Sequence, residues 1–245
     1  MFNQLLPPEL SGGKSFSARD FSMINQNRGC GLGEEALRKR LRSMVQSGDV
    51  IRVGRNAYCV SGTNVSNYRH EYSEEACMVA SAIQEAFPTV EFTVFEMIQL
   101  NEFVNHQLAH NVLFVSVDED VIDFVFELLK ERYSGKVLYN PTLEVYHRYW
   151  SDGMIVINKK VTEAPKGTRE FWHTRLEKLL VDMVSDSLLQ EIISKSEYPS
   201  IFEGAFSDYA IDESCLFRYA RRRGTEKRLR ALIREKTDIL FRTGQ

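Results

Sequence analysis

Residues 33–60 read GEEALRKRLRSMVQSGDVIRVGRNAYCV, and this stretch decides the fold that we expect for the N-terminal part of the chain. Apolar residues recur in it at i, i+4, i+7 and i+8, which is the spacing of one face of a helix. They are Leu37, Leu41, Met44 and Val45. The opposite face carries the cations Arg38, Lys39 and Arg42. Gly48 and Asp49 follow, and glycine tolerates the left-handed conformation that commonly ends a helix.

Two β-rich runs come directly after this helix, at residues 50–53 and 57–60, and turn residues separate them. Arg52 and Arg55 place two further cations on the predicted hairpin. A basic helix can enter the major groove of DNA while a neighbouring hairpin reaches phosphates or the minor groove. The stretch therefore predicts a DNA-binding winged helix-turn-helix.

A purely structural role for the same stretch is the alternative. Glu34 and Arg38 stand four residues apart, as do Glu35 and Lys39, and such pairs decorate many solvated helices. Winged-helix modules also serve as protein-interaction domains. The two arginines of the hairpin favour DNA binding over this alternative, because they add to the charge of the helix.

The composition is that of a soluble globular protein. The chain has 245 residues, of which 43% are hydrophobic and 27% charged, enough for one large domain or two smaller ones. The N-terminal sequence lacks the basic and apolar regions of a secretory signal, and no apolar segment is long enough to span a bilayer. The four cysteines are scattered without a CxxC pair, which favours a reducing, cytoplasmic location.

The formal net charge of -3 conceals a strong segregation along the chain. Residues 1–62 carry 9 Lys/Arg and 5 Asp/Glu, residues 63–213 carry 12 and 26, and residues 214–245 carry 10 and 3. Two basic ends thus flank an acidic middle. Because phosphate contacts depend on nearby cations, such a protein can bind DNA through its ends while its middle faces elsewhere.

Turn-rich residues 61–67 mark a boundary between two predicted domains. The first is the winged helix-turn-helix, over residues 1–62, in which a capping box at residues 17–20 starts a short helix. The second, over residues 68–245, alternates helices and strands. Helices are expected at 73–87, 121–133, 171–193, 214–222 and 225–241, and strands at 90–95, 112–117, 136–139 and 154–157. This order predicts a mixed α/β fold with a sheet of four or five strands, some of them parallel, and a helical, basic C-terminus.

Two sets of side chains have residue types that bind metals. Glu102, His106 and His110 are spaced by four residues on a possible helix, but eight helical residues span about 12 Å, which is too far for one ion. The second set could hold Mg²⁺ for nuclease or nucleotidyl-transfer chemistry. It consists of Asp182 and Asp186, with Glu177 nearby. Hydrogen-bonded histidines and an acidic helix edge are the simpler interpretations of the two sets.

No glycine-rich phosphate loop and no nucleophile motif is present in the sequence. We therefore expect no catalytic residue, no metal and no cofactor. The alternative function is a metal-dependent nuclease or nucleotidyltransferase that carries a DNA-targeting winged helix.

The densest basic cluster is Arg221, Arg222 and Arg223. Cations suit the negative end of a helix dipole, which is the simple explanation. The positive charge continues, however, through Lys227, Arg228, Arg230 and Arg234, and exceeds what a helix end needs. The cluster predicts a second phosphate-contacting surface or a dock for an acidic partner protein.

Five segments of the sequence resemble the abortive-infection antitoxins of type IV toxin–antitoxin systems, in the E-system group. The first is the predicted winged helix, LRKRLRSMVQSGDVIRVGRNAYCV, at residues 37–60. The others are LNEFVNHQ (100–107), TEAPKG (162–167), TRLEKLLVDMVSD (174–186) and FRYARRRG (217–224). The resemblance as a whole extends over most of the chain, from about residue 17 onward.

The resemblance implies a two-part phage-defence protein. Its winged helix would bind and repress the promoter of its own operon, and its C-terminal domain would counteract a nucleotidyltransferase-like toxin without a stable complex. The DNA-binding role falls on Arg38, Lys39, Arg42, Arg52 and Arg55, and Arg221, Arg222 and Arg223 match the basic motif. A homodimer is expected by analogy with palindromic operators. A third hypothesis is an adaptor that binds protein partners through its acidic middle and basic tail.

Overall fold

The computed structural model describes residue 10 and residues 16–47, 49–54, 57–60, 66–104, 107–167, 169–239 and 241, with the backbone alone at 51–54 and 57. Arg52 therefore has a described backbone only, and Arg55 and His106 lie outside the described residues.

The first helix, α1 (Ala18–Asn27), begins at the predicted capping box. The backbone N–H of Asp20 donates to the Ser17 hydroxyl at 3.1 Å, and the Ser17 N–H donates to the Asp20 carboxylate at 2.8 Å. The backbone hydrogen bond from Ser17 is the main reason that the pKa of the Asp20 carboxyl lies below its ordinary value. The capping-box prediction is confirmed.

The second helix, α2 (Glu34–Ser47), is followed by β1 (Val50–Gly54) and β2 (Ala57–Val60), which pair in antiparallel orientation. The predicted helix and hairpin are confirmed. Phe16 and Tyr58 add a further antiparallel bridge, because each N–H donates to the other's carbonyl, at 2.8 and 2.9 Å. The small core of this N-terminal part contains Leu10, Phe16, Phe21, Leu37, Leu41, Met44 and Val50.

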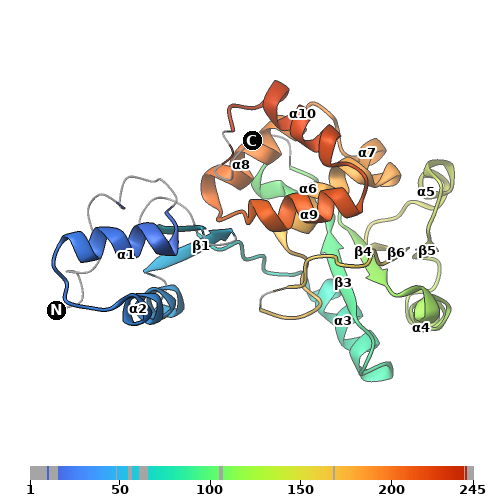
Figure 1. Ribbon diagram of the computed structural model, residues 1–245. Helices are drawn as coiled ribbons and strands as arrows, with labels where there is room; N and C mark the ends of the chain where they lie inside the picture. The colour runs from blue at the N-terminus through green and yellow to red at the C-terminus, as the bar shows by residue number, and fades with distance from the viewer. Residues whose placement is uncertain are drawn as a thin grey trace.

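The rest of the described chain is built on one four-stranded sheet (Figure 1). Its strands are β3 (Phe92–Glu96), β4 (Val112–Val117), β5 (Val137–Tyr139) and β6 (Met154–Lys159). They lie in the order β3-β4-β6-β5. β3 is antiparallel to β4, and the other two pairs are parallel. The expected number of strands and their mixed orientation are confirmed.

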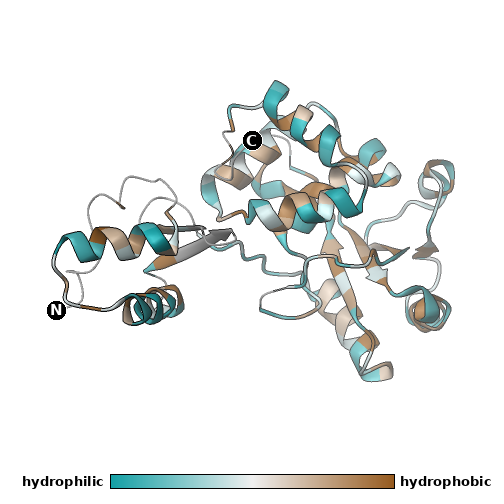
Figure 2. Ribbon diagram, viewed as in Figure 1, coloured by the Kyte–Doolittle hydropathy of each residue, from teal (hydrophilic) through white to brown (hydrophobic). Residues whose placement is uncertain are grey.

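Successive residues of the central strands enter opposite cores, as the two-residue period of a strand requires. Leu113 and Val115 of β4 belong to a core with α3 (Glu74–Ala86) and α4 (Ile122–Arg132). Phe114 between them belongs to a larger core on the other face. Helices thus cover both faces, and Figure 2 shows apolar strands at the centre of this part.

The larger core is formed with a group of five helices that follow the sheet in the sequence. They are α6 (Leu176–Ser185), α7 (Ser187–Ile192), α8 (Tyr198–Asp208), α9 (Glu213–Arg222) and α10 (Glu226–Lys236). The helical C-terminus is therefore confirmed. A short helix, α5 (Leu143–Tyr149), precedes β6.

The prediction of a single helix over residues 171–193 is wrong. Leu176 is the first residue of α6, and Asp186 interrupts the helix by accepting hydrogen bonds from the N–H groups of Leu188 and Leu189, both at 3.0 Å. Asp186 is thus the N-cap of α7, a position that carboxylates favour. The helices α5 and α8 were not predicted.

The prediction of one helix that carries both Glu102 and His110 is also wrong. Glu102 ends the 3₁₀ helix η2 (Met97–Glu102), and its carboxylate accepts a hydrogen bond from the Tyr209 hydroxyl. His110 lies beyond any helix, with its ring 5.0 Å from that of Trp150. These residues therefore share no helix face.

Among the described residues, contacts with α9 and with the segment after α8 connect the beginning of the chain to the rest. β1 touches α9, and Ser66 forms a parallel bridge with the segment that follows α8. In that bridge the N–H of Ser66 donates to Asp208 and the N–H of Ala210 donates to Ser66, at 2.9 and 2.8 Å. None of the described helices combines the length and the apolar composition that crossing a bilayer requires.

Candidate nucleic-acid interface

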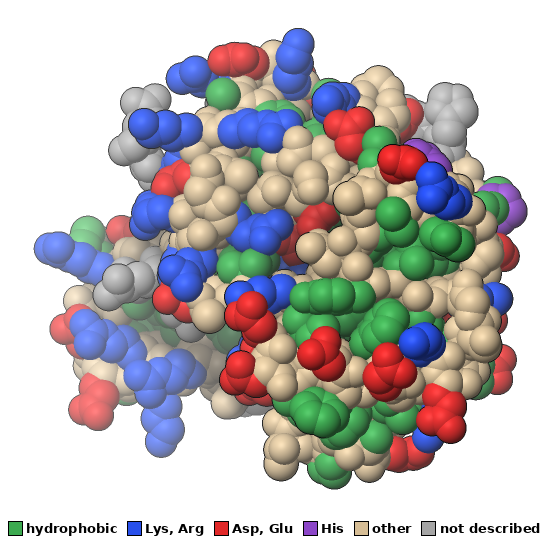
Figure 3. All heavy atoms as spheres, turned by 90° about the vertical axis from the view of Figure 1, so that its right-hand side faces the viewer, with side chains coloured by type: hydrophobic (Ala, Val, Ile, Leu, Met, Phe, Trp, Pro, Cys, Tyr) green, Lys and Arg blue, Asp and Glu red, His purple; other side chains and the backbone are tan. Residues whose placement is uncertain are grey.

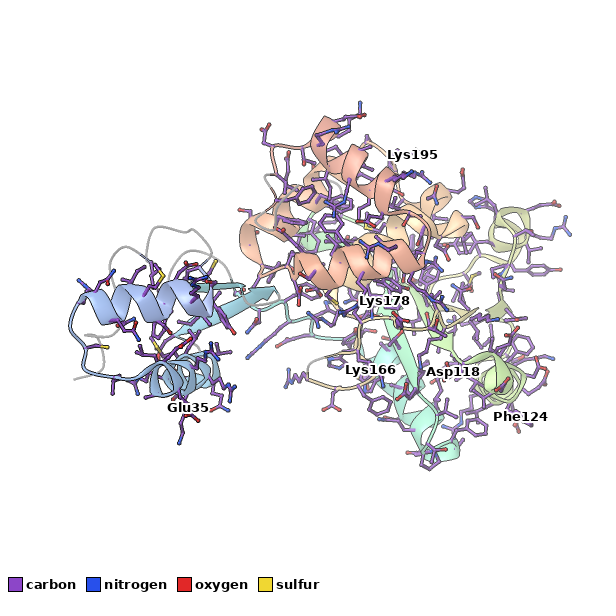
Figure 4. The ribbon with its side chains drawn as sticks, viewed as in Figure 1. Glu35, Asp118, Phe124, Lys166, Lys178 and Lys195 are labelled. Carbon is purple, nitrogen blue, oxygen red and sulfur yellow. The ribbon has the colours of Figure 1, made fainter. Side chains whose placement is uncertain are left out.

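The outward face of α2 carries the cations that the sequence singled out. Arg38, Lys39 and Arg42 are all exposed, whereas Leu37 and Leu41 between them are buried. A shallow depression of about 610 Å³ lies on this face, with Glu34 and Glu35 at its acidic end. Figure 4 labels Glu35 on this side of α2.

A second depression, of about 280 Å³, brings cations from both helices together. Arg38 and Arg42 line it with Arg19 of α1 and with Tyr58 of β2. Sequence reasoning missed Arg19, because its place beside α2 depends on how the two helices pack. The structure thus unites three arginines at the junction of α1, α2 and the hairpin.

The Arg38 side chain also contacts its own helix. Its guanidinium lies 2.7 Å from the Glu34 carboxylate, and both side chains are well exposed, at 61% and 59%. An exposed pair of this kind contributes about 0.2–1 kcal/mol or less, so a phosphate can replace Glu34 as the partner of Arg38 at low cost.

The predicted basic cluster of the C-terminal helices is held by contacts within the chain. Arg221 forms an ion pair with Glu226 at 2.8 Å, and Arg222 donates to the Thr162 hydroxyl. Arg223 donates to the Ser185 hydroxyl at 2.7 Å. In Figure 3 Lys and Arg side chains gather at the upper left, at the height of α9 and α10 in Figure 1. The three arginines stabilise the helical part, and their role toward phosphate stays a prediction.

The carboxylates proposed for metal-dependent chemistry have partners within the protein. Asp182 accepts from Lys178 at 2.6 Å and from the Tyr219 hydroxyl at 2.9 Å. Glu177 accepts from Arg175 and from the N–H of Asp212. Asp182 borders a polar cavity of only about 40 Å³ near the carboxyl ends of β4 and β6. Within the part of the chain that the structure describes, no three His, Cys, Asp or Glu side chains form a metal site.

These features define a mixed α/β protein with an N-terminal pair of helices and a hairpin. The sequence profile of a family of unknown function, DUF6577, matches residues 36–239, and the chain belongs to this family. No curated protein matches the chain. Among solved structures, the chain is similar to the crystal structure of the RV2827C protein from Mycobacterium tuberculosis, with a TM-score of 0.26. The alignment covers 93% of this chain and 78% of that one, and the sequence identity is 10%. That likeness is too weak to transfer any property.

Proposed function

We propose that this protein is a DNA-binding transcriptional regulator whose residues 1–62 form a winged helix-turn-helix. α2 would be the recognition helix, and the β1–β2 hairpin would be the wing. The bridge from Phe16 to Tyr58 supports this proposal, because it attaches the start of α1 to the hairpin. The observation that carries the proposal is the exposed row of Arg38, Lys39 and Arg42 on α2.

The charge distribution supports an interface on this side of the molecule. Most of the acidic side chains of the sequence lie between residues 63 and 213, which DNA phosphates would repel. In contrast, the arginines at the junction of α1 and α2 would attract the phosphates of the DNA backbone. They are Arg19, Arg38 and Arg42. In the proposal Arg38 and Arg42 read base edges, and Arg52 and Arg55 of the wing bind phosphates.

The first test replaces Arg38 and Arg42 with alanine in the full chain and measures binding to the DNA upstream of its own gene over a salt series. We expect operator affinity to fall by about 30-fold or more, because each arginine that reads a base contributes about 1–3 kcal/mol. Both side chains are exposed, so the melting temperature should stay nearly unchanged.

The matched control removes two positive charges elsewhere, by Arg132→Ala together with Arg148→Ala. Both arginines are exposed and lie on α4 and α5, away from α2. Operator affinity should stay near that of the unmodified chain in this control. Equal loss in the two double variants, or loss in neither, would contradict the assignment of α2.

The antitoxin role is a second proposal, and the resemblance described above supports it. Growth of cells that express a nucleotidyltransferase-like toxin from the same operon should be restored by the full chain. The Arg38→Ala and Arg42→Ala double variant should restore growth as well, because the C-terminal domain would carry the neutralising activity. Failure of the soluble, folded full chain to restore growth would refute this role. The nuclease alternative is disfavoured by the internal partners of Asp182 and Glu177.

A further inference from the structure

A cleft of about 540 Å³ lies in the C-terminal part of the protein, apart from α2. Residues from three separate parts of the chain line it: the first group lies between Asn67 and Tyr72, the second lies between Gly167 and Glu177, and the third is the pair Ala210–Ile211. Its volume falls in the range of small-molecule sites, about 300–1,000 Å³. Cations and imidazoles outnumber carboxylates in its lining, which includes Arg69, His70, Arg169, His173 and Arg175 with one carboxylate, Glu177.

The single carboxylate of the cleft, Glu177, forms an ion pair with Arg175. Arg175 binds Glu177 through two nitrogens, at 2.9 and 3.0 Å, and Glu177 is 3% exposed. Arg69 and Arg169 are exposed and have no hydrogen bond or ion pair with any residue that the structure describes. The cleft therefore presents two exposed guanidinium groups that form no ion pair with a described carboxylate.

The two histidines pack against one partly buried aromatic ring. The Tyr72 ring lies 4.8 Å from that of His70 and 4.5 Å from that of His173. Tyr72 itself is fixed, because its hydroxyl donates to the Val94 carbonyl at 3.0 Å and accepts from the Thr174 N–H at 2.8 Å. Both imidazoles are thus positioned before any ligand arrives.

A buried carboxylate orients the first imidazole. His70 Nε2 lies 2.5 Å from Oε1 of Glu96, a side chain with no exposed surface. This contact leaves Nδ1 as the free nitrogen of the ring. A carboxylate that fixes one ring nitrogen in this way sets the tautomer and direction of the other.

The loop that carries His173 is packed too closely for another residue at its start. A Cβ on Gly167 would lie 2.1 Å from the carbonyl oxygen of Glu170 and 2.8 Å from that of His173. Glycine therefore permits the approach that holds the second imidazole at the cleft.

We propose that this cleft binds a phosphate group, belonging to a nucleotide or to a nucleic-acid backbone. Guanidinium groups match the oxygens of phosphate in charge and geometry, and Arg69 and Arg169 are both available. Imidazole N–H groups supply further donors: burial lowers the pKa of His173 and favours its neutral form, which keeps one ring N–H. The one carboxylate that would repel phosphate is neutralised by Arg175.

The histidines provide a direct assay, because the chain contains only five. Proton NMR of the full chain would follow their ring signals during titration with inorganic phosphate and with adenosine monophosphate, after assignment by single His→Gln variants. The signals of His70 and His173 should shift and saturate. Those of His110 and His147, which are exposed and do not line the cleft, should not move.

The arginines are tested by Arg69→Gln together with Arg169→Gln. Apparent affinity for adenosine monophosphate should fall by about 100-fold, since each lost charged hydrogen bond costs about a factor of ten. Arg132→Gln is the matched control, because Arg132 is exposed at the end of α4 and should leave the titration unchanged. No saturable shift of His70 and His173, or equal shifts in the double variant and the unmodified chain, would overturn the proposal.

A third titration, with a short oligonucleotide that lacks the operator sequence, distinguishes the two sources of phosphate. Saturation at lower concentration than with the mononucleotide would assign the cleft to a nucleic-acid backbone, and the reverse order would assign it to a free nucleotide. The inference is independent of the proposed regulator. The Arg38→Ala and Arg42→Ala double variant should keep the histidine shifts, so failure of one proposal is distinguishable from failure of the other.

Discussion

Replacing Asp182 with alanine should lower the free energy of unfolding by about 3–5 kcal/mol, the cost of leaving a buried charge without its partner. The charge in question is the ammonium of Lys178, whose side chain is 6% exposed and which donates to Asp182 at 2.6 Å. Figure 4 labels Lys178 beside α9. Alanine would leave this buried cation at the small polar cavity without its ion-pair partner.

Two further groups would lose an acceptor in the same variant. The Tyr219 hydroxyl donates to Asp182 at 2.9 Å, and burial together with the Asp182 carboxylate raises the pKa of Tyr219, which keeps it a donor. Arg223 lies 3.5 Å from the same carboxylate oxygen and is held mainly by Ser185. Asp182 therefore joins α6 to α9, and its loss weakens the contact between these helices.

Urea unfolding at neutral pH measures the effect. The informative control is Asp182→Leu together with Lys178→Met, which removes both charges and fills the space with apolar groups. This double variant should be markedly more stable than Asp182→Ala, because no buried charge is left unpaired. Equal instability of the two proteins, or a loss below about 1 kcal/mol in Asp182→Ala, would show that the ion pair is not the stabilising element.

This prediction also bears on the alternative enzymatic function. Loss of a metal-dependent activity in Asp182→Ala would not identify a catalytic carboxylate, because the same substitution removes a structural link. Asp182→Asn retains a hydrogen-bond acceptor for Tyr219 and is the better variant for such an assay.

The elements that were predicted correctly depend on local signals. The capping box at Ser17 and Asp20, the apolar face of α2 and the antiparallel pairing of β1 with β2 are each set by residues close together in the sequence. The strands β4 and β6 were visible as apolar runs, because a parallel strand covered on both faces is apolar throughout. Parallel strands were expected, but which strands pair and in what order depends on packing over the whole chain and could not be predicted.

The errors have equally specific causes. The apolar spacing of residues 171–193 continues through Asp186, so a long helix was expected where a capping side chain divides it in two. The cleft was missed because its lining comes from three separate parts of the chain, and neither Arg69 nor Arg169 stands in a recognisable motif. The contacts that hold the two histidines form only when the chain folds, so the sequence does not reveal them.

Replacing Glu96 alone with alanine should lower the free energy of unfolding by about 3–5 kcal/mol. The reason differs from that for Asp182, because here several hydrogen-bond donors lose a shared acceptor. The carboxylate has no exposed surface and accepts hydrogen bonds from three residues: His70, Ser73 and Asn111. The Ser73 backbone N–H donates to it as well, at 3.0 Å, at the N-cap of α3. Alanine leaves each of these donors without its acceptor, and each unsatisfied buried donor costs about 1–3 kcal/mol.

The same carboxylate makes stability depend on pH in a defined direction. Burial alone would raise the pKa of Glu96, but the hydrogen bonds from His70, Ser73 and Asn111 outweigh it and place the pKa below the ordinary 4.5. A carboxyl whose folded pKa is lowered contributes stability that is present above the unfolded value and is lost as pH falls through the folded value. Unfolding free energies of the unmodified chain and of Glu96→Ala should therefore converge below pH 4.5.

The difference in unfolding free energy between the unmodified chain and Glu96→Ala excludes the pH dependence that other acidic residues cause. Glu91, for example, has its pKa lowered to about 2 by Lys166 and Lys160, but it titrates equally in both proteins. A difference that stays constant from pH 7 to pH 3 would contradict the role of the Glu96 charge. Convergence would assign this part of the stability to the Glu96 charge, which also binds His70. The histidine shifts that report phosphate should then be smaller in Glu96→Ala even at neutral pH, because the His70 ring has lost the group that orients it.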